Sequence, residues 1–169
     1  MGHTLEQFSS ACHRILAEEP GVSGRLKICG LLQEALQDPN FVASNLNDDT
    51  PVRKVLYEDP ELGFCVLAHN MKGTNESPPH DHGPSWAIYG QALGETFMSD
   101  WTVLERPSEG HPGKVKRARS YTLKPGMAHL YNEGDVHSPR REGTTWLIRI
   151  EGKNMDKVKR LPYQAVETA

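Results

Sequence analysis

The spacing of apolar residues divides the chain into a helical first part and a strand-rich second part. Between residues 5 and 16, apolar side chains recur at three- and four-residue intervals, which predicts an amphipathic helix that ends before Pro20-Gly21. The same pattern predicts a second helix over residues 22–37 and a short third helix over 41–46. We therefore expect residues 1–50 to form a helical segment that packs on the rest of the fold.

After residue 50, short apolar runs alternate with clusters of Gly, Pro, Asn and Asp, which is typical of an antiparallel β-sandwich or barrel. The expected strands are residues 52–58, 63–70, 85–89, 95–105, 115–124, 129–131 and 144–151. We expect a β-barrel over residues 51–155 and a polar surface tail over 156–169. The predicted fold class is mainly β, with N-terminal helices before a barrel.

Charge and composition exclude several classes of partner. The 19 Lys and Arg against 22 Asp and Glu give a net charge of −3, so the basic excess typical of a nucleic-acid-binding protein is missing. The basic run Lys114–Arg119 is expected to be a solvated edge strand, where such charges prevent edge-to-edge pairing. No run of about 18 apolar residues is present, so we expect no membrane segment.

The N-terminus and the cysteines indicate the compartment. The first residues lack a basic stretch followed by an apolar one, so no secretory signal is expected. Cys12, Cys29 and Cys65 are far apart and form no C-x-x-C pair, which favours reduced, buried thiols over a disulfide framework or a zinc site. We expect a cytoplasmic protein, and an open barrel edge is compatible with a homodimer.

Histidine is the unusual residue of this chain, with eight copies. The most informative segment is Pro79-His80-Asp81-His82-Gly83, because two residues at this spacing on a strand project to the same face. Two imidazoles on one face can bind one metal ion. The alternative is a pair of surface histidines on an edge strand.

A third ligand must come from another part of the chain. His137, in Gly134-Asp135-Val136-His137-Ser138, and His129, after Pro125-Gly126, are the two candidates. Local pattern alone leaves this choice open, since either could also be a hydrogen-bonded barrel histidine. The remaining four are interpreted as structural, exposed or without an assigned function: His3, His13, His69 and His111.

These segments resemble the cysteine dioxygenase (thiol dioxygenase) branch of the cupin superfamily. The resemblance extends over about residues 5–152, and its most specific parts are His-Asp-His-Gly at 80–83 and Gly-Asp-Val-His-Ser at 134–138. It implies a cupin double-stranded β-helix, or jelly-roll barrel, behind N-terminal helices. In that family, the two histidines of H-x-H and one of a later G-D-(I/V)-H element hold a mononuclear non-haem iron. The resemblance therefore assigns His80, His82 and His137 as metal ligands and favours His137 over His129.

The resemblance also implies an activity. A family member of this kind adds O₂ to the sulfur of a small carboxylated thiol, such as cysteine or 3-mercaptopropionate, to give a sulfinate. Three neutral histidines leave Fe(II) its full charge and open positions for a thiolate and O₂. Imidazole ligands also suit Ni, Zn and other divalent transition metals. The expected partners are the small-molecule substrate and O₂.

Four residues are candidate substrate contacts. Arg53 resembles the family position whose arginine holds the substrate carboxylate, and a guanidinium offers two parallel donors for that group. Arg149 is the alternative if its side chain points into the barrel, while Tyr89 and Trp86 are candidate pocket walls. A solvent-exposed Arg53 and a salt bridge from Arg149 to a nearby glutamate are the competing structural interpretations.

The chain departs from the family in the residues that support the metal. It has no cysteine after Cys65, so the cysteine–tyrosine cross-link of the animal enzymes is absent, and Trp86 and Ala87 stand where many cupins add a glutamate ligand. The segment Thr145–Arg149 lacks the Ser-x-His-x-Tyr element of the family. Two alternatives therefore stay open: another O₂-using three-histidine cupin, such as a diketone-cleaving type, or a non-catalytic metal- and ligand-binding cupin. No catalytic side chain is assigned.

Overall fold

The structure is a computed structural model that describes residues 3–156 and 158–166. Within these residues, three helices precede ten strands. The helices are α1 (Leu5–Glu18), α2 (Val22–Leu36) and α3 (Pro39–Asn45). The strands are β1 (Lys54–Glu58), β2 (Cys65–Met71), β3 (Asn75–Glu76), β4 (Ala87–Leu93), β5 (Thr96–Glu105), β6 (Gly113–Leu123), β7 (Ala128–Tyr131), β8 (Val136–Arg141), β9 (Thr145–Glu151) and β10 (Tyr163–Ala165).

The strands form two five-stranded sheets. Their orders are β1-β2-β9-β4-β7 and β10-β6-β5-β8-β3, so the chain crosses from one sheet to the other at every connection except β1–β2 and β5–β6. Winding between two facing sheets in this way is the jelly-roll arrangement of the cupin-type double-stranded β-helix. The predicted fold class is therefore confirmed: mainly β, with helices before the barrel.

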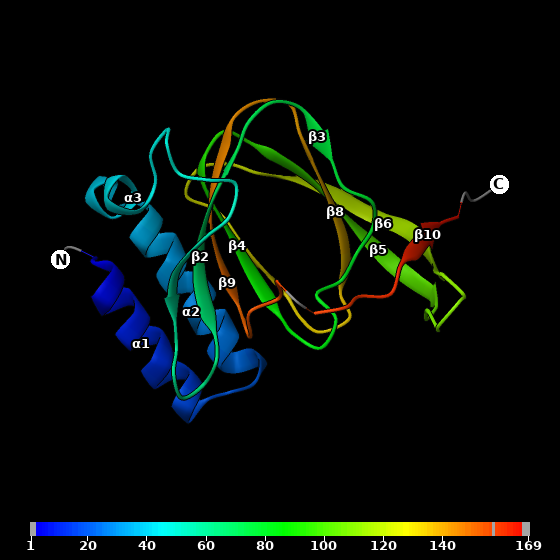
Figure 1. Ribbon diagram of the computed structural model, residues 1–169, viewed down its shortest axis with the longest axis horizontal. Helices are drawn as coiled ribbons and strands as arrows, with labels where there is room; N and C mark the ends of the chain where they lie inside the picture. Colours follow the sequence, from blue (N-terminus) through cyan, green and yellow to red (C-terminus); the bar gives the residue numbers. More distant parts are fainter. Residues whose placement is uncertain (1–2, 157, 167–169) are drawn as a thin grey trace.

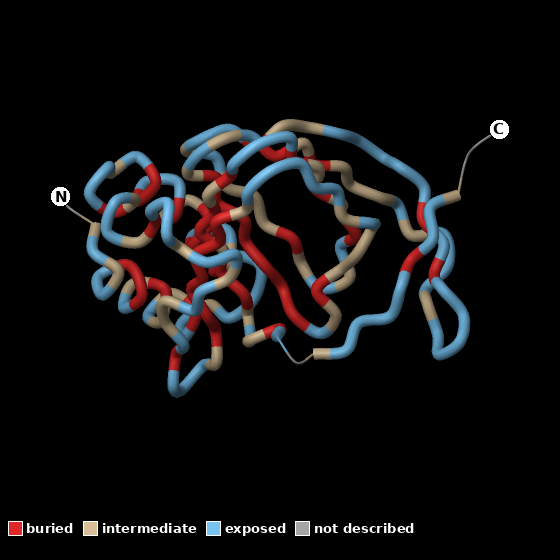
Figure 2. The backbone as a smooth tube through the Cα atoms, turned by 45° about the horizontal axis from the view of Figure 1, so that its top comes forward, coloured by how far each residue is buried: buried red, intermediate tan, exposed pale blue. Residues whose placement is uncertain are grey.

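The helices cover the outer face of the first sheet, and the second sheet lies on the other side of that sheet (Figure 1). Helix α1 begins at Thr4, whose side chain forms a reciprocal capping box with Gln7. Apolar residues of α1 and α2 pack with those of β4 and β9 in one core cluster, and buried segments gather where the helices meet the sheet (Figure 2). The ends of β5 and β6 at the opposite side of the molecule are largely exposed.

Gly90 on β4 permits the close approach of α2 to the sheet. A Cβ atom at this position would lie 2.6 Å from Cδ2 of the fully buried Leu32 and 3.0 Å from the Ile148 carbonyl oxygen. Such separations are shorter than van der Waals contact, so a larger residue would move the helix away from the sheet.

The structure confirms the predicted helices and seven predicted strands, with shifts of one to four residues at most of their ends. The basic run is confirmed as largely exposed on β6, where β10 pairs only with Gly113–Val115. The three cysteines are free and buried, as expected. In the described part of the chain, no helix combines the length and apolar character needed to cross a bilayer.

Three strands were not predicted: β3, β8 and β10. Strand β8 contains Pro139 and two arginines, which obscure the alternation expected of a barrel strand. The predicted surface tail needs a correction, because Tyr163–Ala165 pairs in parallel with β6 and Tyr163 is buried. The polar composition of this segment hid the apolar contact that Tyr163 makes with Val115 and Val136.

Candidate metal centre

Three histidines converge inside the barrel. One ring nitrogen from each of His80, His82 and His137 lies within 4.8 Å of the others, and no second cluster of this kind occurs among the described residues. His137 is on β8, and His80 and His82 lie in the segment between β3 and β4. The expectation that both histidines lie on a strand holds for His80, which makes a β-bridge to His137, but His82 stands in the loop before Gly83, whose φ is +58°.

Backbone carbonyls orient two of the three rings. Nδ1 of His80 lies 2.8 Å from the Pro78 oxygen, and Nδ1 of His137 lies 3.1 Å from the Asp135 oxygen. A carbonyl oxygen only accepts, so each Nδ1 carries the proton and each Nε2 has a free lone pair in the neutral ring. This arrangement of outer hydrogen bonds is typical of histidines that bind a metal through Nε2.

Burial keeps the three rings neutral. Desolvation lowers the pKa of His80 to about 4, and it also lowers the pKa of His82 and His137 well below the ordinary value. Neighbouring positive charge, including that of Arg149, acts in the same direction. Neutral imidazole is the form that binds a metal ion, so these histidines can accept one without first losing a proton.

The positions of the histidine ring nitrogens suit a divalent transition metal. Nε2 of His82 and Nε2 of His137 lie only 3.2 Å apart, and the Tyr89 hydroxyl lies 3.0 Å and 3.2 Å from them. The Nε2 of His137 has no proton to donate, so it presents a lone pair toward Nε2 of His82. A cation at the convergence of these lone pairs would satisfy them, and a three-imidazole set suits iron, nickel, copper or zinc.

Tyrosine rings line the side of the site that faces the barrel interior. The Tyr131 ring stacks on the His137 ring with centroids 4.0 Å apart and an interplanar angle of 28°. The Tyr131 hydroxyl lies 2.6 Å from the Tyr121 hydroxyl, which donates a hydrogen bond to Asp100 Oδ1. This packing holds the His137 ring in place and keeps bulk water from that face.

The C-terminal segment holds the loop between the first two histidines. The Tyr163 hydroxyl donates to Asp81 Oδ2 at 2.7 Å, and Arg160 Nη1 donates to the Asp81 carbonyl oxygen at 3.0 Å. The other carboxylate oxygen of Asp81 accepts the Gly83 N–H at 2.9 Å. Because Asp81 stands between His80 and His82, these bonds position both ligands. Sequence reasoning missed this support, since nothing local links residue 81 with residue 163.

A cavity of about 360 Å³ opens beside the histidines. Its wall contains His80, His82 and Tyr89, together with the three arginines Arg141, Arg149 and Arg160. Tyr89 and Arg149 were both predicted from the sequence to face the pocket, and both are part of this cavity wall. They are directly opposite each other on β4 and β9, with the guanidinium carbon 4.2 Å from the Tyr89 ring centroid. Arg141 and Arg160 were not predicted, and Arg141 is the fourth residue after His137, on the unpredicted β8.

Two predicted substrate contacts lie elsewhere. Arg53 does not line the cavity: its Nη2 donates to Asn154 Oδ1 at 2.9 Å and lies 3.6 Å from Glu151 Oε2. Trp86 packs in the core between the first sheet and the helices, with the Arg25 guanidinium carbon 5.3 Å from its ring centroid. Trp86 and Tyr89 are an odd number of positions apart along the β4 region, so their side chains point to opposite faces.

The other five histidines lie outside the three-histidine cluster. His129, the alternative third ligand, lies on β7 between the rings of Tyr121 and Tyr131 and is not part of the cluster. Nδ1 of the buried His69 lies 2.9 Å from the Val52 carbonyl oxygen. His111 is exposed, His13 bonds Asp59, and the His3 backbone bonds Asp38.

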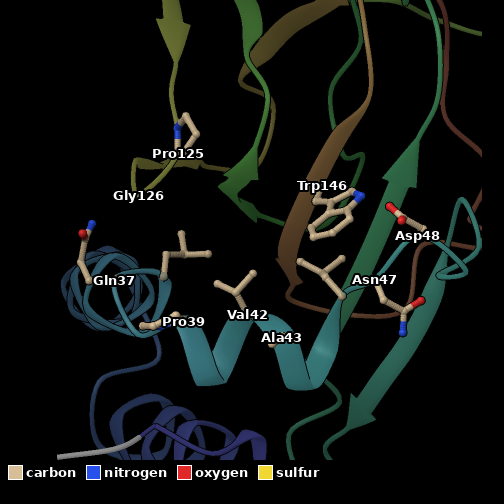
Figure 3. A pocket seen from close by; sticks show the side chains of 11 residues that line it. Gln37, Pro39, Val42, Ala43, Asn47, Asp48, Pro125, Gly126 and Trp146 are labelled. Atoms are coloured by element: carbon tan, nitrogen blue, oxygen red, sulfur yellow. The ribbon is translucent and has the colours of Figure 1, made fainter.

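A separate apolar groove of about 650 Å³ lies on the helical side of the first sheet (Figure 3). Val42 and Ala43 of α3 form one wall, and Trp146 of β9 and Pro125 lie across from them. None of the three clustered histidines lines it. The groove is therefore distinct from the candidate metal centre.

Comparison with known proteins gives fold likenesses only. No family model matches the chain, and no curated protein matches it. A cupin-2 domain containing protein from Shewanella frigidimarina is 15% identical over 66% of this chain and 86% of that chain, with a TM-score of 0.43. KdgF from Halomonas sp. is 16% identical over 62% of this chain and 83% of that chain, with a TM-score of 0.44.

A third similar structure is a protein with a double-stranded β-helix domain from Klebsiella pneumoniae. It is 15% identical over 71% of this chain and 85% of that chain, with a TM-score of 0.47. The cupin-type fold of the present chain follows from its own strand order. Its three-histidine cluster is a candidate metal site within that fold.

Proposed function

We propose that this protein is a non-haem iron dioxygenase that oxidises a small carboxylated thiol to a sulfinate. The observation that carries the proposal is the convergence of three neutral histidines, His80, His82 and His137, beside a cavity whose wall contains His80, His82 and Arg149. Fe(II) held by His80, His82 and His137 would supply the redox chemistry, because it would let electrons pass from the thiolate sulfur to O₂. The electrons that the sulfur loses are the ones that reduce O₂, and both oxygen atoms end on the sulfur, so no other reductant is needed.

The residues of the chain would bind and orient the substrate. The Arg149 guanidinium can hold a carboxylate through two parallel N–H donors. Tyr89, directly opposite Arg149, places its hydroxyl within 3.2 Å of two ligand nitrogens. This hydroxyl can donate a hydrogen bond to a group at the metal position. The buried site around it excludes bulk water, which strengthens these polar contacts.

Oxygen consumption with iron-loaded protein tests the proposal. Protein loaded with Fe(II) under argon is mixed with 3-mercaptopropionate, cysteine, cysteamine or acetylacetone in an oxygen electrode, and products are identified by mass spectrometry. We expect one O₂ consumed per carboxylated thiol and a product heavier by one O₂. Zn(II)-loaded protein is the matched control, because zinc has no accessible redox change. Oxygen consumption with acetylacetone alone would instead indicate a diketone-cleaving enzyme.

A non-catalytic metal- and ligand-binding protein is the second candidate. One observation favours it: the inner face of β9 carries Leu147, Arg149 and Glu151, so neither a histidine nor a tyrosine supports the site from this strand. In that case the iron-loaded protein would bind a thiol acid and consume no O₂.

A further inference from the structure

Arg141 is a buried cation without a counter-charge. The residue is only 2% exposed, its Nε donates to Thr96 Oγ1 at 3.2 Å, and its Nη2 is buried with no hydrogen-bond partner. Among the described residues, no carboxylate forms an ion pair with it. A buried guanidinium without a counter-charge lowers the stability of the fold. A bound anion from outside the chain would offset this cost.

Arg149, which lines the same cavity, also has a guanidinium N–H without a hydrogen-bond acceptor. Its Nε is buried without a partner, and its Nη1 lies 3.6 Å from Glu151 Oε1. Glu151 is shared, because its other oxygen accepts the Met155 N–H at 3.2 Å and lies 3.6 Å from Arg53 Nη2. The Glu151 carboxylate is therefore shared by Arg53 and Arg149, and it forms no ion pair with Arg141.

The wall of the cavity beside the histidines is positively charged. Arg141, Arg149 and Arg160 line it, and its wall contains no aspartate or glutamate. The remaining lining residues are Met71, Asn75, Ser77, Pro78, His80, His82, Tyr89 and Pro139. Burial, followed by the charge of Arg149, lowers the pKa of Arg141 to about 10, which still leaves it charged at neutral pH. A ligand in this cavity thus meets positive charge and no negative charge from the wall.

We propose that Arg141 and Arg149 form the carboxylate subsite of this cavity, and that the cavity selects a thiol acid without an ammonium group. The inference rests on the proposed function for the identity of the thiol. A carboxylate in the cavity would place a counter-charge beside both guanidinium groups, and charge-assisted bonds to guanidinium are the strong ones. The ammonium group of cysteine would have to lose its water shell beside three arginines with no acid to receive it. The preferred substrate is therefore of the 3-mercaptopropionate type, with cysteine a poor one and cysteamine excluded.

Calorimetric binding tests the subsite without any need for turnover. Propionate is titrated into metal-free protein, and 3-mercaptopropionate, cysteine and cysteamine are titrated into Zn(II)-loaded protein. We expect propionate to bind without metal and 3-mercaptopropionate to bind at least about tenfold more tightly than cysteine. Equal affinity for cysteine would overturn the selectivity, and inorganic phosphate binding more tightly than propionate would overturn the carboxylate assignment.

Variants locate the subsite. Arg141→Met and Arg149→Met should each weaken propionate binding by about 10–100-fold, the size expected for losing hydrogen bonds to a charged group. The matched control is Arg140→Met, the neighbour on β8, whose guanidinium lies over the Phe97 ring and which is not part of the cavity wall. If Arg141→Met does not fold, Arg141→Lys is the substitute, because it keeps the charge and loses the planar guanidinium. Propionate should bind to Arg141→Lys more weakly than to the wild-type protein. Unchanged binding in both Arg141 variants would refute the subsite.

The two proposals can fail separately. Absence of O₂ consumption by iron-loaded protein would contradict the dioxygenase, whereas the carboxylate subsite depends only on the calorimetric affinities.

Discussion

His80 and His137 exchange two backbone hydrogen bonds, from His80 N–H to the His137 oxygen at 3.0 Å and from His137 N–H to the His80 oxygen at 2.9 Å. Residues paired in this way stand directly opposite each other with side chains on the same face. Their ring centroids are accordingly 4.7 Å apart. The backbone therefore brings two candidate ligands together from distant parts of the chain and holds their rings on one face.

Removing any ligand should abolish tight metal binding. We expect His80→Ala, His82→Ala and His137→Ala each to weaken Zn(II) affinity by more than about 100-fold, which exceeds the usual loss for an outer hydrogen-bond partner. Competition with a coloured chelator measures this affinity. The control is His129→Ala, which removes the alternative third ligand and should leave the affinity nearly unchanged. A larger loss for His129→Ala than for His137→Ala would mean that the third ligand has been misassigned.

Tyr163 should tune the metal site from the C-terminal strand. Its hydroxyl donates to Asp81 Oδ2 at 2.7 Å and accepts a longer bond from Arg106 Nη1 at 3.3 Å, so Tyr163→Phe keeps the ring packing and removes these two hydrogen bonds. We expect metal affinity to fall by about tenfold, at the lower end of outer-partner effects. The exposed neighbour offers the control Leu161→Ala, which should have no effect. The same chelator competition is the measurement, and equal affinity in wild type and Tyr163→Phe would show that the loop holds its shape without this bond.

Leu32 should be a main contributor to the free energy of unfolding. It is fully buried where α2 packs on Gly90 of β4. Leu32→Ala removes buried methyl groups and leaves a cavity, so urea unfolding should show a loss of about 2–5 kcal/mol. Leu26 on the same helix is 57% exposed, and Leu26→Ala should change stability by less than about 0.5 kcal/mol. Similar losses in the two variants would contradict the packing described for α2.

Asp59 should make stability depend on acid pH. Burial alone raises the pKa of this carboxyl group, but hydrogen bonds from the backbone of Leu62 and Glu61 and from the side chains of His13 and Tyr57 outweigh it and lower the pKa to about 2. The folded-state pKa is thus below the unfolded value, so the stabilisation is complete above about pH 5 and is lost as the pH falls toward 2.

The expected contribution is about 1–2 kcal/mol at neutral pH. Urea unfolding at several pH values between neutrality and pH 3 measures it. Asp59→Asn should be less stable at neutral pH and show a flatter decline toward acid. If wild type and variant decline in parallel, another carboxyl group is responsible.

Local pattern was sufficient for much of the fold. The helix stripe through Phe8 and Cys12 was readable because apolar spacing repeats within each turn, and the strands between turn clusters were readable for a similar reason. Strand β8 was not readable, since Pro139 and its arginines break the alternation and the strand exists through pairing with β5. Strand β10 was hidden for a similar reason: β6, with which it pairs, is far away in sequence.

At the site, the sequence by itself determined the two histidine motifs and the candidacy of Arg149 and Tyr89, because these depend on residue type and short spacing. Only the tertiary structure decided that Arg141 lines the cavity and Arg53 does not, that Trp86 faces the helices, and that the Tyr163 hydroxyl bonds Asp81. The physical reason is register. Which face of a strand meets the barrel interior is set by long-range pairing such as Tyr89 with Arg149, and a local pattern does not encode that pairing.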